Sequence, residues 1–477
     1  MKKILFVTSE VHPLIKTGGL ADVSGSLPKA LAELGEDIRI ILPYYQAIKT
    51  NEAIYYKSTI RINDSEINIL ETQLPGTNVI VWLIDYPKFF KLPGNPYHDA
   101  TGNAWANSAE RFGLFCQAAV EIAMNRGYLD WKPDIVHCND WQSGLVPALL
   151  SLELSRPTTL FTIHNLAYQG VFPKSANFIL NLPTQLWESG GTEFHGMLSF
   201  LKSGLTYADR INTVSPTYAL EIQTAKFGCG LEGLLSYRKD VLSGIINGID
   251  TDHWNPETDP NITANFTYTS LNKKQLNKAA LQTKTSLPIS DKIPIFGLIT
   301  RLVEQKGIDL VLNCLPDILK LPVQLVVLGS GNKEFEQQLI DLATANPDKM
   351  AVQIGYDEEL AHLIEAGLDI FLMPSRYEPC GLNQMYSQLY GTIPLVSKVG
   401  GLADTVVDSL PDTLANNTAT GIVFDGALAG TLIEAIKRAL MLYNQPKAWK
   451  QIQINGMQKE FSWTQSAQQY IELYGQL

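Results

Sequence analysis

Short apolar runs alternate with segments of helical spacing along most of the chain. One series of runs lies in the amino-terminal half, and a second begins near Lys292. Continuous apolar strands are typical of parallel sheets that helices cover on both faces. The expected strands are Ile4 to Thr8, Arg39 to Leu42, Asp134 to Cys138, Thr159 to Ile163, Ile211 to Val214 and Val241 to Ile246, and then Ile293 to Ile299, Gln324 to Leu328, Met350 to Ile354, Asp369 to Pro374 and Ile393 to Val396. The pattern predicts an α/β protein whose first strand, loop and helix open a Rossmann-like unit.

Residues 50 to 92 instead alternate polar and apolar positions, which is typical of half-buried strands. The segments concerned are Tyr55 to Ile62, Ile67 to Thr72 and Val79 to Ile84. Helical spacing predicts helices over Ala21 to Leu34, Ala106 to Arg126, Ile308 to Leu319 and Trp463 to Leu477.

One turn of the second series has residues suited to chemistry. Glu378 and Gly381 follow the expected strand Asp369 to Pro374 and precede a helix-period segment that begins at Leu382 and ends before Gly391. Open α/β sheets bind ligands at this edge, and Gly381 lets an anion approach the unpaired N–H groups of the helix start. A carboxylate repels phosphate, so Glu378 is better suited to hydroxyl groups joined to the phosphate. A sugar-nucleotide site and an ordinary turn with a solvated Glu fit this stretch equally well.

Composition narrows the class of protein. The chain has 477 residues, enough for two or three domains, and its 18% charged content gives no sign of disorder. A net charge of −11 argues against a binder of nucleic acid or of anionic membranes. Five scattered cysteines form no CxxC pair, no apolar run reaches transmembrane length, and the amino terminus is better interpreted as a first strand than as a signal peptide. We therefore expect a cytoplasmic protein.

An anionic ligand of such a protein needs local cations. Arg301 and Lys306 flank a turn of the second series, where they suit a diphosphate. Lys16 and Gly18 lie in a paired-glycine loop before the first helix, which is weak evidence because such loops are usually simple turns. Neither series has the GxGxxG pattern of a dinucleotide site.

Further polar residues follow the strands of the first series. Asp140 ends one strand, and His164 with Asn165 ends the next, so all three fall on one edge of one sheet. The simpler interpretation of each is a turn residue or helix cap. No Ser or Cys nucleophile pattern stands near His164, which disfavours a hydrolase triad.

Metal sites are not favoured. His137 and Cys138 are neighbours in a strand and point to opposite faces. Asp250 and Asp252 have a DxD spacing that suits a divalent ion, but they lie in a Gly/Asn/Pro-rich segment where a capped turn is the better interpretation.

These residues also carry a resemblance to a known family. The segments concerned are Lys16-Thr-Gly-Gly-Leu-Ala-Asp22, Asn139-Asp-Trp141, Thr162-Ile-His-Asn165, Asn247-Gly-Ile-Asp250, Arg301-Leu302 with Gln305-Lys-Gly307, the run from Pro374 through Leu382, and Gly400-Gly-Leu-Ala-Asp404. In this order they resemble bacterial glycogen synthases and plant starch synthases, which are retaining glycosyltransferases of GT-B fold. The resemblance implies two Rossmann-like domains with the active site in the cleft between them. It implies transfer of glucose from ADP-glucose to the non-reducing end of an α-1,4-glucan, without a cofactor or a metal.

The resemblance also implies a domain division and roles for single residues. We expect an acceptor-side domain over 1–246, a linker over 247–265, a nucleotide-sugar domain over 266–456 and a helix over 457–477 that crosses back to the first domain. Lys16, Gly18 and Asp22 would lie at the donor and acceptor loop, with Asp140 and Asn165 also binding substrate, and His164 and Asn247 would face the reacting glucose. Arg301 and Lys306 would hold the diphosphate, Tyr356 would stack on adenine, Glu378 would hold glucose hydroxyls, and Gly381 with Leu382 would present N–H groups to phosphate.

Three features depart from the family pattern, and three alternative functions remain. Related retaining enzymes such as sucrose synthase carry a second Glu where this chain has Tyr386, and many family members have Leu-Arg where it has Gln388-Leu389. The absence of a plastid-type extension favours a bacterial enzyme. The rivals are a retaining GT-B transferase that uses UDP-glucose or another acceptor, and a non-catalytic glucan-binding relative. A nicotinamide dehydrogenase fits less well, because GxGxxG is absent.

Overall fold

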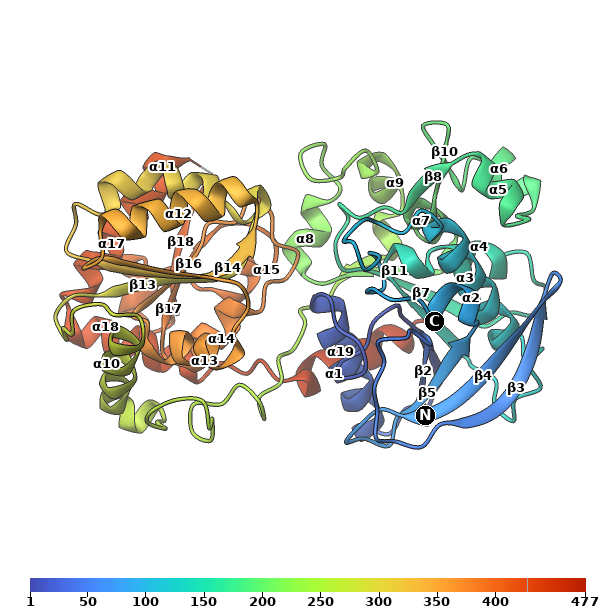
Figure 1. The fold of residues 1–477 in the computed structure, drawn as a ribbon, viewed down its shortest axis with the longest axis horizontal. Helices are drawn as coiled ribbons and strands as arrows, with labels where there is room; N and C mark the ends of the chain where they lie inside the picture. Colours follow the sequence, from blue (N-terminus) through green and yellow to red (C-terminus); the bar gives the residue numbers. More distant parts are fainter. Residues whose placement is uncertain (427) are drawn as a thin grey trace. The chain divides into compact units, whose positions relative to one another are not determined.

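The computed structural model describes residues 1–426 and 428–477, and the chain forms two compact units (Figure 1). Unit 1 comprises Met1–Gly248 together with Trp463–Leu477, and unit 2 comprises Ile249–Ser462. Residues 249–265, where we expected a linker, are part of unit 2. Both units are α/β, as the alternating pattern predicts.

A nine-stranded sheet forms the centre of unit 1, in the order β12-β11-β7-β6-β1-β2-β5-β4-β3. Its strands are β1 (Lys3–Val7), β2 (Asp37–Pro43), β3 (Tyr55–Ile62), β4 (Ser65–Gln73), β5 (Ile80–Asp85), β6 (Ile135–Asn139), β7 (Thr158–Ile163), β11 (Arg210–Thr213) and β12 (Leu242–Gly244). All pairs are parallel except β3 with β4 and β4 with β5, which are antiparallel. These antiparallel strands are the segments that alternate in sequence. A small antiparallel sheet of β8 (Val171–Pro173), β10 (Met197–Ser199) and β9 (Glu193–Phe194) lies apart from the large one.

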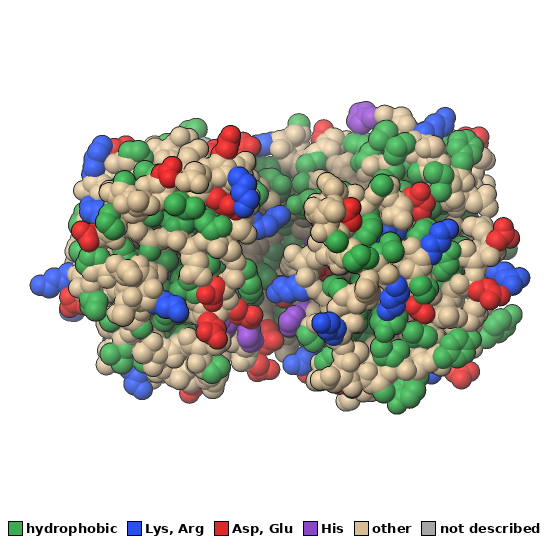
Figure 2. Space-filling view, in the orientation of Figure 1, with side chains coloured by type: hydrophobic (Ala, Val, Ile, Leu, Met, Phe, Trp, Pro, Cys, Tyr) green, Lys and Arg blue, Asp and Glu red, His purple; other side chains and the backbone are tan. Residues whose placement is uncertain are grey.

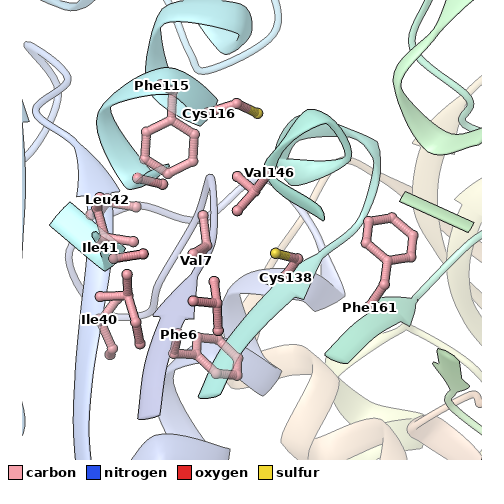
Figure 3. Packing of buried hydrophobic residues seen from close by; sticks show 14 of the residues in the cluster. Phe6, Val7, Ile40, Ile41, Leu42, Phe115, Cys116, Cys138, Val146 and Phe161 are labelled. Carbon is pink, nitrogen blue, oxygen red and sulfur yellow. The ribbon is translucent and has the colours of Figure 1, made fainter. Parts of the chain in front are cut away.

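Helices cover both faces of the large sheet. The helices of unit 1 are α1 (Gly19–Glu33), α2 (Pro87–Phe90), α3 (Ser108–Ala123), α4 (Leu145–Leu150), α5 (Ser175–Ile179), α6 (Thr184–Glu188), α7 (Phe200–Tyr207), α8 (Pro216–Glu221), α9 (Glu232–Tyr237) and α19 (Trp463–Tyr474), with 3-10 turns at Trp141–Ser143 and Lys239–Val241. Figure 3 shows Val7 of β1 on the side of the sheet where Phe115 of α3 and Val146 of α4 lie, while Phe6 points the other way. Successive residues of a strand therefore enter two apolar layers.

The late helix α19 completes the core of unit 1. Tyr470 and Tyr474 are 0% and 1% exposed. The Tyr474 hydroxyl lies 2.8 Å from Nδ1 of His137 on β6, and the amide of Asn212 on β11 donates to the Tyr470 hydroxyl at 3.0 Å. The expected helix over Trp463 to Leu477 is therefore present through Tyr474, and it packs on strands that precede it by more than 200 residues.

Unit 2 is built on a six-stranded parallel sheet in the order β15-β14-β13-β16-β17-β18. The strands are β13 (Ile295–Leu302), β14 (Gln324–Gly331), β15 (Met350–Ile354), β16 (Ile370–Met373), β17 (Ile393–Ser397) and β18 (Ile422–Phe424). The helices are α10 (Lys274–Lys284), α11 (Ile308–Ile318), α12 (Lys333–Ala345), α13 (Glu358–Gly367), α14 (Asn383–Leu389), α15 (Gly400–Thr405), α16 (Pro411–Ala415), α17 (Ala429–Tyr443) and α18 (Pro446–Met457), with 3-10 turns at Tyr268–Lys273 and Glu304–Lys306.

Alternate residues of these strands enter separate apolar clusters. Leu325 and Val327 of β14 pack with α11, α12 and α17, whereas Val326 and Leu328 pack with α10 and α13. A strand with both faces buried needs apolar residues at every position, which is why β16 is a continuous apolar run. The sheet places the ends of β13, β15, β16 and β17 along one edge, and the expected ligand residues of unit 2 follow these ends.

The surface carries charges of both signs. Figure 2 shows acidic and basic side chains interspersed on the visible face of each unit, without a continuous basic patch there. Within the described residues, no helix combines the length and the apolar character needed to cross a membrane.

Candidate active site

The loop between β1 and α1 brings two of the expected residues together. Lys16 Nζ lies 2.7 Å from Asp22 Oδ1, and both side chains are partly exposed. A Cβ atom added at Gly18 or Gly19 would meet nothing within 4 Å, so packing does not require glycine at either position. The open space beside this backbone leaves room for a ligand to approach it.

Glu10 holds this loop in place, although no local sequence pattern marks it as a site residue. The residue is only 2% exposed, and its Oε2 atom accepts hydrogen bonds from the N–H groups of Thr17 and Gly18. The Tyr97 hydroxyl donates to Oε1 at 2.5 Å and also lies 2.9 Å from the Ser9 hydroxyl. A buried carboxylate that accepts several hydrogen bonds fixes the loop conformation more firmly than a solvated turn would.

The ends of β6 and β7 bring Asp140, His164 and Asn165 together. Asp140 Oδ1 accepts the N–H of His164 at 2.7 Å and that of Asn165 at 3.4 Å. Asp140 itself has a φ of 56° and a ψ of −179°, a strained backbone conformation that is otherwise largely limited to glycine. The Asp140 carboxylate thus orients the backbone of the turn that carries the two other residues.

His164 is held in one orientation by Asn139, whose Oδ1 lies 2.9 Å from Nε2 of the ring. Asn139 is fixed in turn, because its amide donates to the Val7 carbonyl at 3.1 Å. An amide oxygen can only accept, so this contact assigns the ring proton to Nε2. Burial lowers the pKa of His164 to about 3, so the ring is neutral at neutral pH. Burial also raises the pKa of Asp140 to about 7, against the two backbone hydrogen bonds that lower it.

Asn247 lies at the end of unit 1 and is 6% exposed. Its side-chain oxygen is buried and has no hydrogen-bond partner among the described residues. Buried amide oxygens are normally paired, so this atom is a candidate acceptor for a ligand hydroxyl. The structure records no hydrogen bond between Asn247 and the other expected residues of unit 1 within the described part of the chain.

In unit 2, the turn after β16 joins Lys306 to Glu378. Lys306 Nζ lies 2.5 Å from Glu378 Oε2, and the Ser375 hydroxyl donates to the same oxygen at 3.0 Å. The two side chains are 18% and 7% exposed. A carboxylate so placed is fixed in position, as a group that binds hydroxyls must be.

Gly307, Gly400 and Gly401 pack closely against the backbone of this turn. A Cβ at Gly400 would lie 2.0 Å from the Glu378 carbonyl oxygen, and one at Gly401 would lie 2.1 Å from that of Cys380. The Gly401 N–H donates to the Glu378 carbonyl at 3.1 Å. Gly307, with a φ of 70°, packs in the same way against the Pro374 carbonyl. The paired glycines that begin α15 therefore support the turn that carries Glu378.

Gly381 and Leu382 immediately precede α14. Gly381 has a φ of 74°, which favours glycine, and Leu382 is the N-cap residue of the helix. The Gln384 amide donates to the Cys380 and Gly381 carbonyls, both at 3.1 Å, and thereby fixes the loop to the helix. The N–H groups at the beginning of a helix have no partner within it, so those at the start of α14 are candidate donors to an anion.

Two expected nucleotide contacts lie on the surface of unit 2. Arg301 is the penultimate residue of β13, is exposed, and donates to Gln305 Oε1 at 3.3 Å. Tyr356 follows β15 and is 75% exposed. Arg301 can reach an anion from this position, and the exposed Tyr356 ring offers a face for stacking.

The remaining acidic pair forms a turn. Asp250 Oδ1 accepts the N–H groups of Asp252 at 3.0 Å and His253 at 3.2 Å, the geometry of an Asx turn. The expected site residues thus form two sets, one in each unit, and each set lies at the carboxyl ends of parallel strands.

Comparison with known proteins defines the class. Residues 3–237 match the family described as starch synthase catalytic domain, and residues 281–455 match glycosyl transferases group 1. With two α/β units on largely parallel sheets, the protein is a glycosyltransferase of GT-B fold. It is 56% identical to glycogen synthase 1 of Methylococcus capsulatus over 99% of this chain and 96% of that one. It is 53% identical to the glycogen synthase of Cellvibrio japonicus over the full length of both. The chain belongs to the glycogen synthase and starch synthase family.

Solved structures agree with this membership. The catalytic domain of starch synthase IV from Arabidopsis thaliana, bound to ADP and acarbose, superposes with a TM-score of 0.88 at 32% identity and covers 100% of this chain and 99% of that one. A sucrose-phosphate synthase from Thermosynechococcus elongatus has a TM-score of 0.60 at 18% identity, with 100% and 99% coverage, and shares the fold. The activity that follows from the family is glucosyl transfer in glycogen synthesis.

Proposed function

We propose that this protein transfers glucose from ADP-glucose to the non-reducing end of an α-1,4-glucan, with retention of the anomeric configuration. The observation that carries the proposal is the contact of Lys306 with Glu378 in the turn before α14. It places a cation and a hydroxyl-binding carboxylate side by side, next to helix N–H groups that suit a phosphate. A sugar joined to a diphosphate needs these three kinds of group together.

The donor side is assigned to unit 2. Arg301 and Lys306 neutralise the diphosphate, Gly381 and Leu382 donate N–H groups to it, and Tyr356 stacks on the base. Preorganised positive charge at a departing anion is usually a large term in transfer catalysis. The bound ADP of the similar Arabidopsis starch synthase supports an adenine nucleotide as the donor.

The reacting sugar is assigned to residues of unit 1. His164 offers its ring and its backbone carbonyl to the glucose. The buried side-chain oxygen of Asn247, which has no partner among the described residues, accepts a hydrogen bond from a glucose hydroxyl. Asp140 and Asn165 shape the same turn, while Lys16, Gly18 and Asp22 bind where donor and acceptor meet. Because the ring proton of His164 lies on Nε2, which donates to Asn139, the neutral ring offers Nδ1 to the glucose as a hydrogen-bond acceptor and brings no charge.

The mechanism that we propose has no glucosyl-enzyme intermediate. Glu378 shares its turn with the phosphate-binding groups, which puts it on the leaving-group side of the sugar, whereas a nucleophile attacks from the opposite face. Its carboxylate is also already engaged by Lys306 and Ser375. The acceptor hydroxyl then attacks from the side on which the diphosphate departs, and the diphosphate takes its proton.

The test compares donors directly. Protein, glycogen and either ADP-glucose or UDP-glucose are incubated, release of nucleoside diphosphate is measured, and the new linkage is identified by NMR. We expect ADP release at least tenfold faster than UDP release, with new α-1,4 linkages. Faster turnover of UDP-glucose would favour the rival retaining transferase, and glycogen binding without turnover of either donor would favour a non-catalytic relative.

A further inference from the structure

Three side chains of unit 2 form a cluster that the glucosyl transfer does not use. A ring nitrogen of His253, a ring nitrogen of His362 and a carboxylate oxygen of Glu358 all lie within 4.8 Å of one another. His253 Nε2 and Glu358 Oε1 are 3.0 Å apart, and their side chains are 48% and 52% exposed. Glu358 begins α13 and His362 lies one turn later, so both project from one face of that helix.

His362 is the buried member of the cluster, with an exposed fraction of 0%. Its Nδ1 atom lies 2.7 Å from Asp259 Oδ2, whereas its Nε2 atom is buried and has no hydrogen-bond partner among the described residues. The Asp259 carboxylate accepts a hydrogen bond from Nδ1–H, so in the neutral ring the Nε2 lone pair has no partner among the described residues. A buried lone pair without a partner is costly, and a metal ion would satisfy it.

Asp259 is positioned to support such a ligand. Besides His362, it accepts the Tyr390 hydroxyl at 2.5 Å and the Asn261 N–H at 2.8 Å, so its orientation is fixed. Trp254 stacks on the His362 ring, with centroids 3.8 Å apart and planes 4° apart, and holds the ring plane. A carboxylate on the far nitrogen of a metal-binding imidazole is the usual arrangement around protein metal ions.

We propose that His253, Glu358 and His362 bind a divalent transition-metal ion, for which Zn²⁺ is the reference. Two imidazoles and one carboxylate are a ligand set that zinc accepts, with a water in the fourth position. Bonds of about 2.0–2.1 Å at tetrahedral angles separate ligand atoms by about 3.3 Å. The contact between His253 and Glu358 already has nearly this spacing. The remaining gap closes by rotation of these two exposed side chains, while His362 stays fixed.

The bound ion would link two separate segments of unit 2. His253 lies in the segment that follows the boundary at Gly248, whereas Glu358 and His362 belong to α13. Trp254 also stacks on Tyr386 of α14, at 4.2 Å between centroids. Metal binding would therefore fix the segment after the boundary to α13 and, through Trp254, to α14.

The test uses the untagged full chain, stripped with EDTA and dialysed. The exposed Cys229 is replaced by Ser to remove a competing thiol ligand. Isothermal titration with Zn²⁺ should give one site, and Co²⁺ should give the intense visible absorption of a tetrahedral ion. We expect His253→Ala and Glu358→Gln each to weaken Zn²⁺ binding by at least about 100-fold. Both residues are exposed, so neither variant is expected to disturb folding.

Two matched variants control for surface binding. His98→Ala and His195→Ala remove exposed histidines outside the cluster and should leave the titration unchanged. Ni²⁺ should also quench the fluorescence of Trp254, and the quenched component should be missing in Trp254→Phe. Failure of the parent chain to bind Zn²⁺, or equal binding by His253→Ala and the parent, would overturn the proposal. Glucosyl transfer is not a readout, so this outcome is separate from the test of the proposed function.

Discussion

Lys306 and Glu378 are 72 positions apart in sequence, yet the lysine nitrogen lies 2.5 Å from the glutamate oxygen in a largely buried contact. The same pair joins the turn after β13 to the turn after β16. It therefore contributes to the stability of unit 2 as well as to the proposed donor site, and the two contributions can be separated by substitution.

Replacement of Lys306 should lower both stability and turnover. Lys306→Met leaves Glu378 buried without its cation, at a cost of about 2 kcal/mol, and removes a contact to the diphosphate worth about 3 kcal/mol in the transition state. The double variant Lys306→Met/Glu378→Gln should recover most of the stability and none of the turnover. Urea unfolding and ADP release measure the two effects.

The control for the Lys306 and Glu378 variants is Lys320→Met. Lys320 pairs with Asp317 in a contact whose side chains are 74% and 60% exposed. Exposed pairs contribute little, so both measurements should stay close to those of the parent. Near-normal turnover in Lys306→Met would contradict the diphosphate assignment.

Arg301→Ala should likewise cut turnover by about 100-fold.

Glu378→Gln tests the role of the carboxylate. The amide keeps the size and part of the hydrogen bonding, so we expect ADP affinity within a few-fold of the parent and turnover lowered by about 100-fold. A slow fluorinated donor followed by mass spectrometry should find no glucosyl ester on Glu378. Detection of that ester in the parent protein would overturn the non-covalent mechanism.

Glu10 should act as a positioning residue for the loop that carries Lys16. Glu10→Gln weakens the hydrogen bonds to the Thr17 and Gly18 N–H groups, so turnover should fall by about 10- to 100-fold, while Glu33→Gln on the exposed side of α1 should not change it. Amide exchange should rise in residues 10–18 and stay unchanged in unit 2. Unchanged exchange in the loop would argue against this role.

Removal of metal ions should leave the reaction intact. Arg301, Lys306 and the start of α14 neutralise the diphosphate in the proposed mechanism, so turnover should survive EDTA. Loss of turnover with rescue by Mg²⁺ or Mn²⁺ would make Asp250 and Asp252 candidate ligands. Rescue by Zn²⁺ alone would instead connect turnover to His253, Glu358 and His362.

The lowered pKa of His164 predicts a pH dependence of stability. The unfolded ring takes a proton below its ordinary pKa of about 6.5, whereas the folded ring stays neutral down to about 3. The unfolded state therefore binds more protons in this window, and stability falls as pH falls, by up to about 1.4 kcal/mol per pH unit. His164→Gln should flatten the dependence between pH 6.5 and pH 4, while His195→Gln should not. Thermal unfolding across that range measures both.

Most of the sheet could be predicted from sequence because its strands are buried on both faces. The continuous apolar run of β16 and the alternation of β3 and β4 follow directly from what each strand packs against. The segment from Leu166 to Asp209 was not assigned. Its strands β8, β9 and β10 have only two or three residues each, which is too short to show a period.

The site was predicted only where a residue type at a strand end was itself informative. Glu378 and Lys306 stand out in this way. The roles of Glu10 and of Asn139 depend on partners that only the fold brings near, the Thr17 and Gly18 N–H groups for Glu10 and the His164 ring for Asn139. The roles of buried polar groups are harder still to predict from sequence. Lys274 Nζ donates to Thr392 Oγ1 at 2.7 Å and to the Tyr390 carbonyl at 2.9 Å, and burial lowers its pKa to about 7. No local pattern distinguishes such a lysine from an exposed one.

The place of α19 also affects how the protein is made on the ribosome. Domains usually fold in the order of their synthesis. Here unit 1 lacks the side chains of Tyr470 and Tyr474 until the ribosome has passed the whole of unit 2. Strands β6 and β11 contact these tyrosines. Their apolar face therefore stays uncovered while more than 200 further residues are translated. The second unit made can thus be the first to finish folding, and the nascent first unit is the part most in need of a chaperone.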